Sequence, residues 1–162
     1  MSIKAKITHL TTLGLLTALI TISGALKLPG LLPGSEFQLS APIAVAVCAI
    51  FGIKYYLISG ILSSLIGLML GTQHIFNVGI ALIFRLVVVV CFLFTGKSKF
   101  FYLLAGPLAT LIARLVISLF LGKAAIPLIL AALPGMFYTS VTSKLIAKIL
   151  ERVSIPRPFL ES

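Results

Sequence analysis

The sequence contains no aspartate, and its glutamates are limited to Glu36, Glu151 and Glu161, none of which lies inside an apolar run. Cysteine is almost as scarce, since Cys48 and Cys91 are the two present, and both fall within apolar stretches without the spacing of a metal site. There is no cluster of acids or histidines and no nucleophile beside a base. These absences argue against an enzyme, and they predict that the protein holds neither a metal nor a cofactor.

Apolar residues are present in excess. They make up 60% of the 162 residues, the mean hydropathy is +1.23, and only 10% of the residues are charged. Soluble domains carry about 25% charged residues, so this is the composition of an integral membrane protein. The net charge of +10 is spread over short loops and forms no patch with interleaved aromatic residues, which argues against nucleic acid as a partner.

The apolar runs predict an all-α bundle of six transmembrane helices, with one domain over residues 1–153 and a short tail at 154–162. The predicted spans are residues 7–26, 39–53, 55–70, 78–95, 100–121 and 134–152, the last one opening at Pro134-Gly135. Lysines and arginines concentrate in the loops of one face, which predicts that both termini are cytoplasmic. The expected location is the cell membrane, with the lipid bilayer as the main environment.

Two of the predicted spans carry small residues where another helix can approach closely. Gly14 and Ala18 form a small-xxx-small pair on the first span, which indicates either packing within the bundle or docking on a separate membrane subunit. Lys54-Tyr55-Tyr56, where the third span begins, predicts an aromatic belt at the membrane interface. The third span itself is predicted to pack at the bundle centre, because it carries Ser59, Gly60, Ser63, Ser64 and Gly67.

Two arginines lie inside predicted spans, Arg85 in the fourth and Arg114 in the fifth. A guanidinium at bilayer depth costs several kcal/mol even on lenient insertion scales, so each is a candidate functional residue. No acid lies inside an apolar run, which leaves backbone carbonyls, water, the loop residue Glu36 or an anionic ligand as partners. We favour the anionic ligand. The alternative is that the arginines bond helix-end carbonyls, or extend to the interface, and only shape the fold.

Helical rise tests whether these groups can act together. Counted from Asn77 and from Leu121, both arginines lie roughly 10–12 Å below the outer surface. Counted from Pro134, Tyr138 to Thr142 reach roughly 6–12 Å on the same rule. The sequence therefore predicts a solute-binding site at one level, open to the outside and beneath the outer loops.

In this site we expect Arg85 to pair with a carboxylate in bidentate fashion, and Phe37 and Tyr138 to pack on the apolar part of the solute. The loop residues could instead be ordinary solvated surface, which is the usual role of a lone histidine such as His74. The full set of candidate residues is Arg85, Arg114, Glu36, Phe37, Gln38, Gln73, His74, Asn77, Tyr138, Thr139 and Thr142.

A cytoplasmic N-terminus, six short spans, a Pro/Gly-rich first outer loop and Leu133-Pro134-Gly135 before the last span together resemble the substrate-binding S components of energy-coupling factor (ECF) importers. The resemblance covers essentially the whole chain and rests on layout and short motifs. The run from Pro33-Gly34 to Gln38-Leu39 is most similar to the biotin-type components. The sequence departs from them by lacking their Gly-Gly-Tyr stretch before the fourth span, and by carrying Met136 where they place an acid.

The resemblance implies a subunit that captures a small, carboxylate-bearing, vitamin-like solute from outside the cell. Gly14-xxx-Ala18 is similar to the family's Ala-xxx-Ala pair, which implies docking on a coupling transmembrane subunit and, through it, on two cytoplasmic ATPases. The chain has no Gly-rich phosphate loop and no acidic metal-holding pair, so energy must come from those partners. The competing hypothesis is a non-transport scaffold of similar layout, such as the rod-shape membrane proteins, which would use Gly14/Ala18 and Gly67/Gly71 to hold partners.

Overall fold

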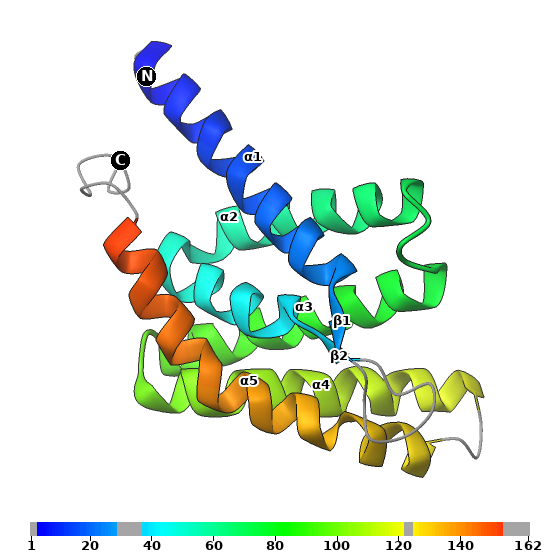
Figure 1. Cartoon of the computed structure of the whole chain (residues 1–162). Coiled ribbons are helices and arrows are strands. Elements are labelled where there is room, and N and C mark those ends of the chain that lie inside the picture. Colours follow the sequence, from blue (N-terminus) through cyan, green and yellow to red (C-terminus); the bar gives the residue numbers. More distant parts are fainter. Residues whose placement is uncertain (1–2, 29–36, 122–124, 154–162) are drawn as a thin grey trace.

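The protein is a bundle of helices, and its structure is a computed structural model that describes residues 3–28, 37–121 and 125–153 (Figure 1). Five helices in the described part are long and apolar enough to cross a membrane, so the chain is a multi-pass membrane protein. In chain order the elements are α1 (Ile3–Ala25), β1 (Lys27–Leu28), β2 (Phe37–Gln38), α2 (Ser40–Met69), α3 (Ile75–Thr95), α4 (Lys99–Leu121) and α5 (Ala125–Val153).

Helix α2 consists of two segments that run in opposite directions on either side of Gly52 (Figure 1). Gly52 has φ 85° and ψ 175°, a conformation that glycine adopts easily because it has no Cβ. Close to the first residue of α2, a Cβ built on Gly24 would lie 3.6 Å from both Ser40 Oγ and Gln73 Nε2, so the two ends of α2 lie near each other. The prediction of six separate helices is therefore corrected to five, because the second and third predicted spans form one element without a loop between them.

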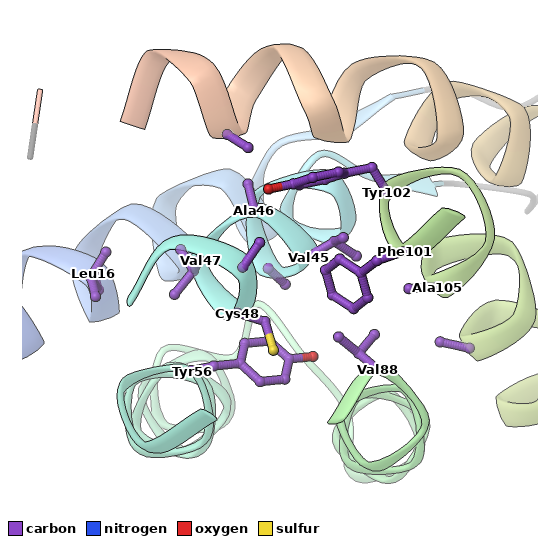
Figure 2. Packing of buried hydrophobic residues seen from close by; sticks show 14 residues of the cluster. Leu16, Val45, Ala46, Val47, Cys48, Tyr56, Val88, Phe101, Tyr102 and Ala105 are labelled. Carbon is purple, nitrogen blue, oxygen red and sulfur yellow. The ribbon is translucent and has the colours of Figure 1, made fainter. Parts of the chain in front are cut away.

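The first segment of α2 is the centre of the molecule. Val45, Ala46, Val47 and Cys48 are fully buried, as expected for a helix that is apolar on every side. Side chains from the other helices surround it, and Figure 2 shows those of α1, α3 and α4 together with Tyr56 from the second segment of α2. The short, continuous apolar run that predicted the second span thus forms the core.

The last helix begins earlier than predicted. The sequence interpretation opened this span at Pro134-Gly135, whereas α5 begins at Ala125 and contains Pro134 in its interior. Proline removes one backbone donor, and membrane helices tolerate it because neighbouring groups satisfy the carbonyl that loses its partner. Residues 125–133, which the prediction left outside every span, are the first part of α5.

Helix α1 and the ends of its loop complete the described chain. The first half of α1 is exposed and extends past the other helices (Figure 1). Beyond α1 the backbone pairs antiparallel, with Lys27 opposite Gln38 and Leu28 opposite Phe37. This two-residue ribbon closes the base of the predicted first outer loop, whose central residues 29–36 lie outside the described part.

Large apolar side chains cover much of the outer surface of the helices. Leu86 and Leu93 on α3, Leu103 on α4 and Phe137 and Val141 on α5 are more than half exposed. An exposed apolar surface of this extent is stable in contact with lipid, and it agrees with the membrane assignment.

Candidate functional site

Arg85, near the middle of α3, is buried within the bundle and lies against the second segment of α2. Its side chain is 7% exposed, and Nη1 donates a hydrogen bond of 2.9 Å to Ser64 Oγ. A guanidinium has five N–H donors, so this bond uses a small part of its capacity. Within the described residues, Arg85 therefore keeps donors for a further partner.

The close approach of Arg85 to α2 depends on Gly60. A Cβ at Gly60 would lie 2.8 Å from Arg85 Cδ and would overlap Arg85 Nε as well, so the arginine stem occupies the space that a larger residue would fill. Gly60 and Ser64 are one helical turn apart on the same face. The glycine admits the side chain and the serine receives its head group.

The positive charge of Arg85 has no acidic partner in the described part of the chain. Glu151 is the only acid there, and it pairs with Lys97 at 2.8 Å, near the junction of α3 and α4. Arg85 is ten residues before Thr95, the end of α3, which places it about 15 Å along the helix from that junction. The acid therefore neutralises a surface lysine, and among the described residues no acid compensates the buried arginine.

Gln73, in the turn between α2 and α3, packs against the same face of α2, about one helical turn beyond Ser64. Its side chain is 8% exposed, and it packs on Gly67, whose added Cβ would lie 3.1 Å from Gln73 Cδ. The backbone N–H of Gln73 donates to the Gly67 carbonyl at 3.1 Å, which holds the turn in place. Gln73 Oε1 is buried and accepts no hydrogen bond within the described residues.

Tyr56 is fully buried and corrects the predicted aromatic belt. Its exposure is 0%, and its hydroxyl has no hydrogen-bond partner among the described residues. Figure 2 places its ring in the core beside Cys48, with the hydroxyl directed toward Val88 of α3. Tyr55 is partly exposed and contacts His9 of α1, ring centroid to ring centroid at 4.6 Å. Of the two tyrosines, Tyr56 therefore belongs to the interior and not to the interface.

The prediction that Arg114 and the α5 hydroxyls share one level is wrong. Thr139 packs directly on Gly106, and Ser140 Oγ donates to the Leu103 carbonyl at 2.9 Å, so the register of α4 and α5 is set at these residues. Arg114 lies eight residues beyond Gly106, about 12 Å along α4. Arg114 and Thr139 therefore lie at different levels along the bundle axis.

The α5 hydroxyls are engaged by their own helix. Thr139 Oγ1 donates to the Gly135 carbonyl at 2.8 Å, and Thr142 Oγ1 donates to the Tyr138 carbonyl at 2.6 Å. Thr139 is buried against α4, while Tyr138 and Thr142 are half-buried, as is Arg114 on α4. Their assignment to a solute site stays a prediction.

Of the remaining predicted loop residues, the structure describes His74, Asn77 and the backbone of Phe37 and Gln38. His74 precedes the first residue of α3, is exposed and does not cap the helix with its side chain. Asn77 is half-buried in the first turn of α3. Phe37 and Gln38 form β2, and Glu36 lies outside the described residues.

The predicted docking residues on α1 lie along an open, apolar groove of about 430 Å³ between α1 and the second segment of α2. Gly14 and Ala18 are exposed, and a Cβ at Gly14 would contact nothing within 4 Å. The small-xxx-small pair is therefore not used for packing in the described bundle. The residues that line the groove are Gly14, Thr17, Ala18, Thr21, Ile22, Leu62 and Ile66.

The structure thus places Arg85 and Gln73 along one face of α2, against Gly60 and Gly67, and adds residues that the sequence interpretation missed as site residues. Gly60 and Ser64 were interpreted as packing residues, and Tyr56 as part of the interface. A signal was present: Tyr56, Gly60, Ser64 and Gly67 recur every three or four residues, which is the spacing of one helix face. In a membrane segment, such a small and polar face can approach a charged neighbour.

Comparison with known proteins finds a relative that spans nearly the whole chain. The chain is 45% identical over 145 residues to Protein BioX of Lysinibacillus sphaericus, and the alignment covers 90% of this chain and 87% of that protein. No protein-family model matches the chain. No solved structure matches it.

Proposed function

The chain belongs to the family of Protein BioX, and from this premise we propose that it is the membrane-embedded, solute-binding subunit of an ECF-type importer. Its solute is a small, vitamin-like molecule that carries a carboxylate. The observation that carries this proposal is Arg85, which is 7% exposed, bonded to Ser64 and without an acidic partner in the described part of the chain.

The physical argument is one of charge balance. An uncompensated guanidinium in the interior of a membrane protein is costly, and arginines in such positions mark ligand or ion sites. A carboxylate presents two oxygens to the planar guanidinium, so it can accept two parallel hydrogen bonds. Arg85 would take this role, and Ser64 would hold the guanidinium in position while the solute is absent.

The wider assembly follows from the resemblance to S components. Both termini would lie in the cytoplasm of a cell whose plasma membrane contains the protein. The groove beside Gly14 and Ala18 would receive the coupling transmembrane subunit, because small residues allow helix backbones to approach closely. Two cytoplasmic ATPases, bound to that subunit, would supply the energy, and the chain itself would not be an enzyme. Solute release would follow reorientation of the bundle while it is docked.

The competing function is a membrane scaffold that binds no solute. The exposed Gly14 and Ala18 are compatible with it, because a scaffold also needs helix faces that hold partners. The buried face around Arg85 favours the binding subunit, since a scaffold has no need for an arginine inside the bundle with donors to spare.

Native mass spectrometry of the detergent-purified protein tests the proposal. The binding subunit is expected to retain a small carboxylic acid, whose mass identifies the solute. Biotin and straight-chain mono- and dicarboxylic acids are then titrated to measure affinity. A protein that is folded, carries no small molecule and binds none of these acids would support the scaffold instead.

A further inference from the structure

We propose that Tyr56 is a second anion-binding residue of the solute site, whose phenolic hydroxyl donates a hydrogen bond to the carboxylate that Arg85 pairs with. This inference rests on the proposed function and deepens it. It assigns a role to a side chain that is 0% exposed and whose hydroxyl has no partner among the described residues.

The position of Tyr56 relative to Arg85 carries the first step. Tyr56 lies one helical turn before Gly60 on the same face of α2, and the Arg85 side chain lies directly against Gly60. Figure 2 shows the Tyr56 hydroxyl directed toward Val88, which follows Arg85 by about one turn of α3. The phenol and the guanidinium are also close enough to interact electrostatically.

The hydrogen-bonding state of the two groups carries the second step. A buried hydroxyl without a partner is unfavourable, and most buried polar side chains in folded proteins are satisfied. The hydroxyl could accept a bond from Arg85, yet the guanidinium bonds Ser64 instead. Among the described residues, the phenol has no acceptor, and the guanidinium keeps donors beyond the one that bonds Ser64. A carboxylate oxygen between them would satisfy the phenol and the guanidinium at once.

The geometry also predicts which solutes are rejected. The primary amide of a bound acid replaces one oxygen with an NH₂ group, which cannot accept from Arg85 or from Tyr56. A site that presents several unpaired donors discriminates strongly against a molecule that leaves them unpaired. Tyr56 is thus expected to contribute to selection of the acid over its amide.

The test compares Tyr56→Phe with Tyr102→Phe in the full chain. Tyr102 is a second buried tyrosine of the same core, on α4, and its hydroxyl points toward Ala46, away from Tyr56 (Figure 2). The probes are biotin and straight-chain mono- and dicarboxylic acids, with affinity measured by calorimetry and the Tm of the solute-free protein measured in parallel. Tyr56→Phe is expected to weaken binding about tenfold without lowering the solute-free Tm, because it removes only a hydroxyl that has no partner there. Tyr102→Phe is expected to bind as the wild type does.

Three results would overturn the inference: unchanged affinity in Tyr56→Phe, a loss of affinity accompanied by a lower solute-free Tm, or equal losses in the two phenylalanine variants. The fate of the proposed function is read separately, from the wild type and Arg85→Lys. If the wild type binds a probe and Arg85→Lys weakens it, the binding subunit stands whatever Tyr56→Phe does. If the wild type binds none of the probes, both proposals fail.

Discussion

Two helix contacts in this bundle have the same kind of packing but differ in the hydrogen bonding of the side chain that is packed. At each, a glycine on one helix allows a side chain of the next helix to lie against its backbone. Gly106 on α4 receives Thr139 of α5, and Gly60 on α2 receives Arg85 of α3. The Thr139 hydroxyl is satisfied by the Gly135 carbonyl at 2.8 Å. Among the described residues, the Arg85 guanidinium bonds Ser64 and has donors left over.

The difference separates a packing contact from a site. At the described contact between α4 and α5, the hydroxyls of Thr139 and Ser140 both donate to carbonyls, so this contact needs no further partner. Between α2 and α3 a cation, a phenol and an amide oxygen are buried with their hydrogen bonds incomplete in the described part of the chain. Small residues in a membrane helix therefore do not by themselves identify a function; the side chain they admit does.

The largest effect on solute affinity is expected when the charge of Arg85 is removed. Arg85→Ala should weaken binding of the carboxylate solute about 100-fold or more, because truncating one partner of a buried charge pair costs about 2–5 kcal/mol. Isothermal titration measures the affinity. Loss of solute-free thermal stability in Arg85→Ala equal to its loss of binding would indicate a structural arginine.

Replacing the two glycines with alanine sharpens the comparison. At Gly60 the new Cβ must displace the flexible Arg85 side chain, so we expect an affinity loss of about tenfold or more with a smaller change in stability. At Gly106 it meets the β-branched Thr139, so we expect a destabilisation of about 1–3 kcal/mol with affinity nearly unchanged. Thermal unfolding measures the stability of both variants, and titration measures their solute affinity. The comparison breaks if Gly106→Ala loses affinity as strongly as Gly60→Ala.

A smaller effect is expected at the serine that holds Arg85. Ser64→Ala removes one hydrogen bond to the guanidinium, and a bond to a charged group is worth about 1.5–3 kcal/mol, of which a bound carboxylate would replace a part. We expect a loss of affinity of about fivefold, on the order of 1 kcal/mol. Ser59→Ala is the matched control, because Ser59 is equally buried and donates to the Tyr55 carbonyl of its own helix. Equal losses in the two variants would remove Ser64 from the site.

The smallest effect on solute affinity is expected on α1. Gly14→Leu places a large side chain beside the exposed groove, where an added Cβ contacts nothing within 4 Å. Solute binding and Tm should match the wild type, while copurification with the coupling subunit should fall. Normal complex formation by this variant would show that the partner docks elsewhere.

Much of the fold could be predicted from hydropathy, because crossing a bilayer requires long apolar helices. The helices α3 and α4 lie close to their predicted bounds, and Arg85 was identified as a candidate from its cost in lipid. The joining of two spans at Gly52 was not predicted, since a single glycine with positive φ leaves no loop in the sequence. The start of α5 was misplaced because Pro134 was interpreted as a helix start.

The candidate site was harder to predict than the fold. Depth counted from assumed helix ends placed Arg114 and Thr139 at one level, whereas the contact of Thr139 with Gly106 sets a different register. Helix register in a bundle depends on which side chains pack, and that information is not in the spacing of apolar residues. Tyr56 was missed because a tyrosine beside a lysine is typical of the interface, and only packing shows that its hydroxyl is enclosed.

The most direct test of the central claim is a comparison of acids with their amides on two proteins. Biotin and straight-chain carboxylic acids, each against its primary amide, are titrated by calorimetry into the wild type and into Arg85→Ala. If Arg85 pairs with the carboxylate of the solute, the wild type prefers the bound acid about 100-fold, and the variant shows little preference. An undiminished preference for the acid in Arg85→Ala, or none in the wild type, would contradict the account.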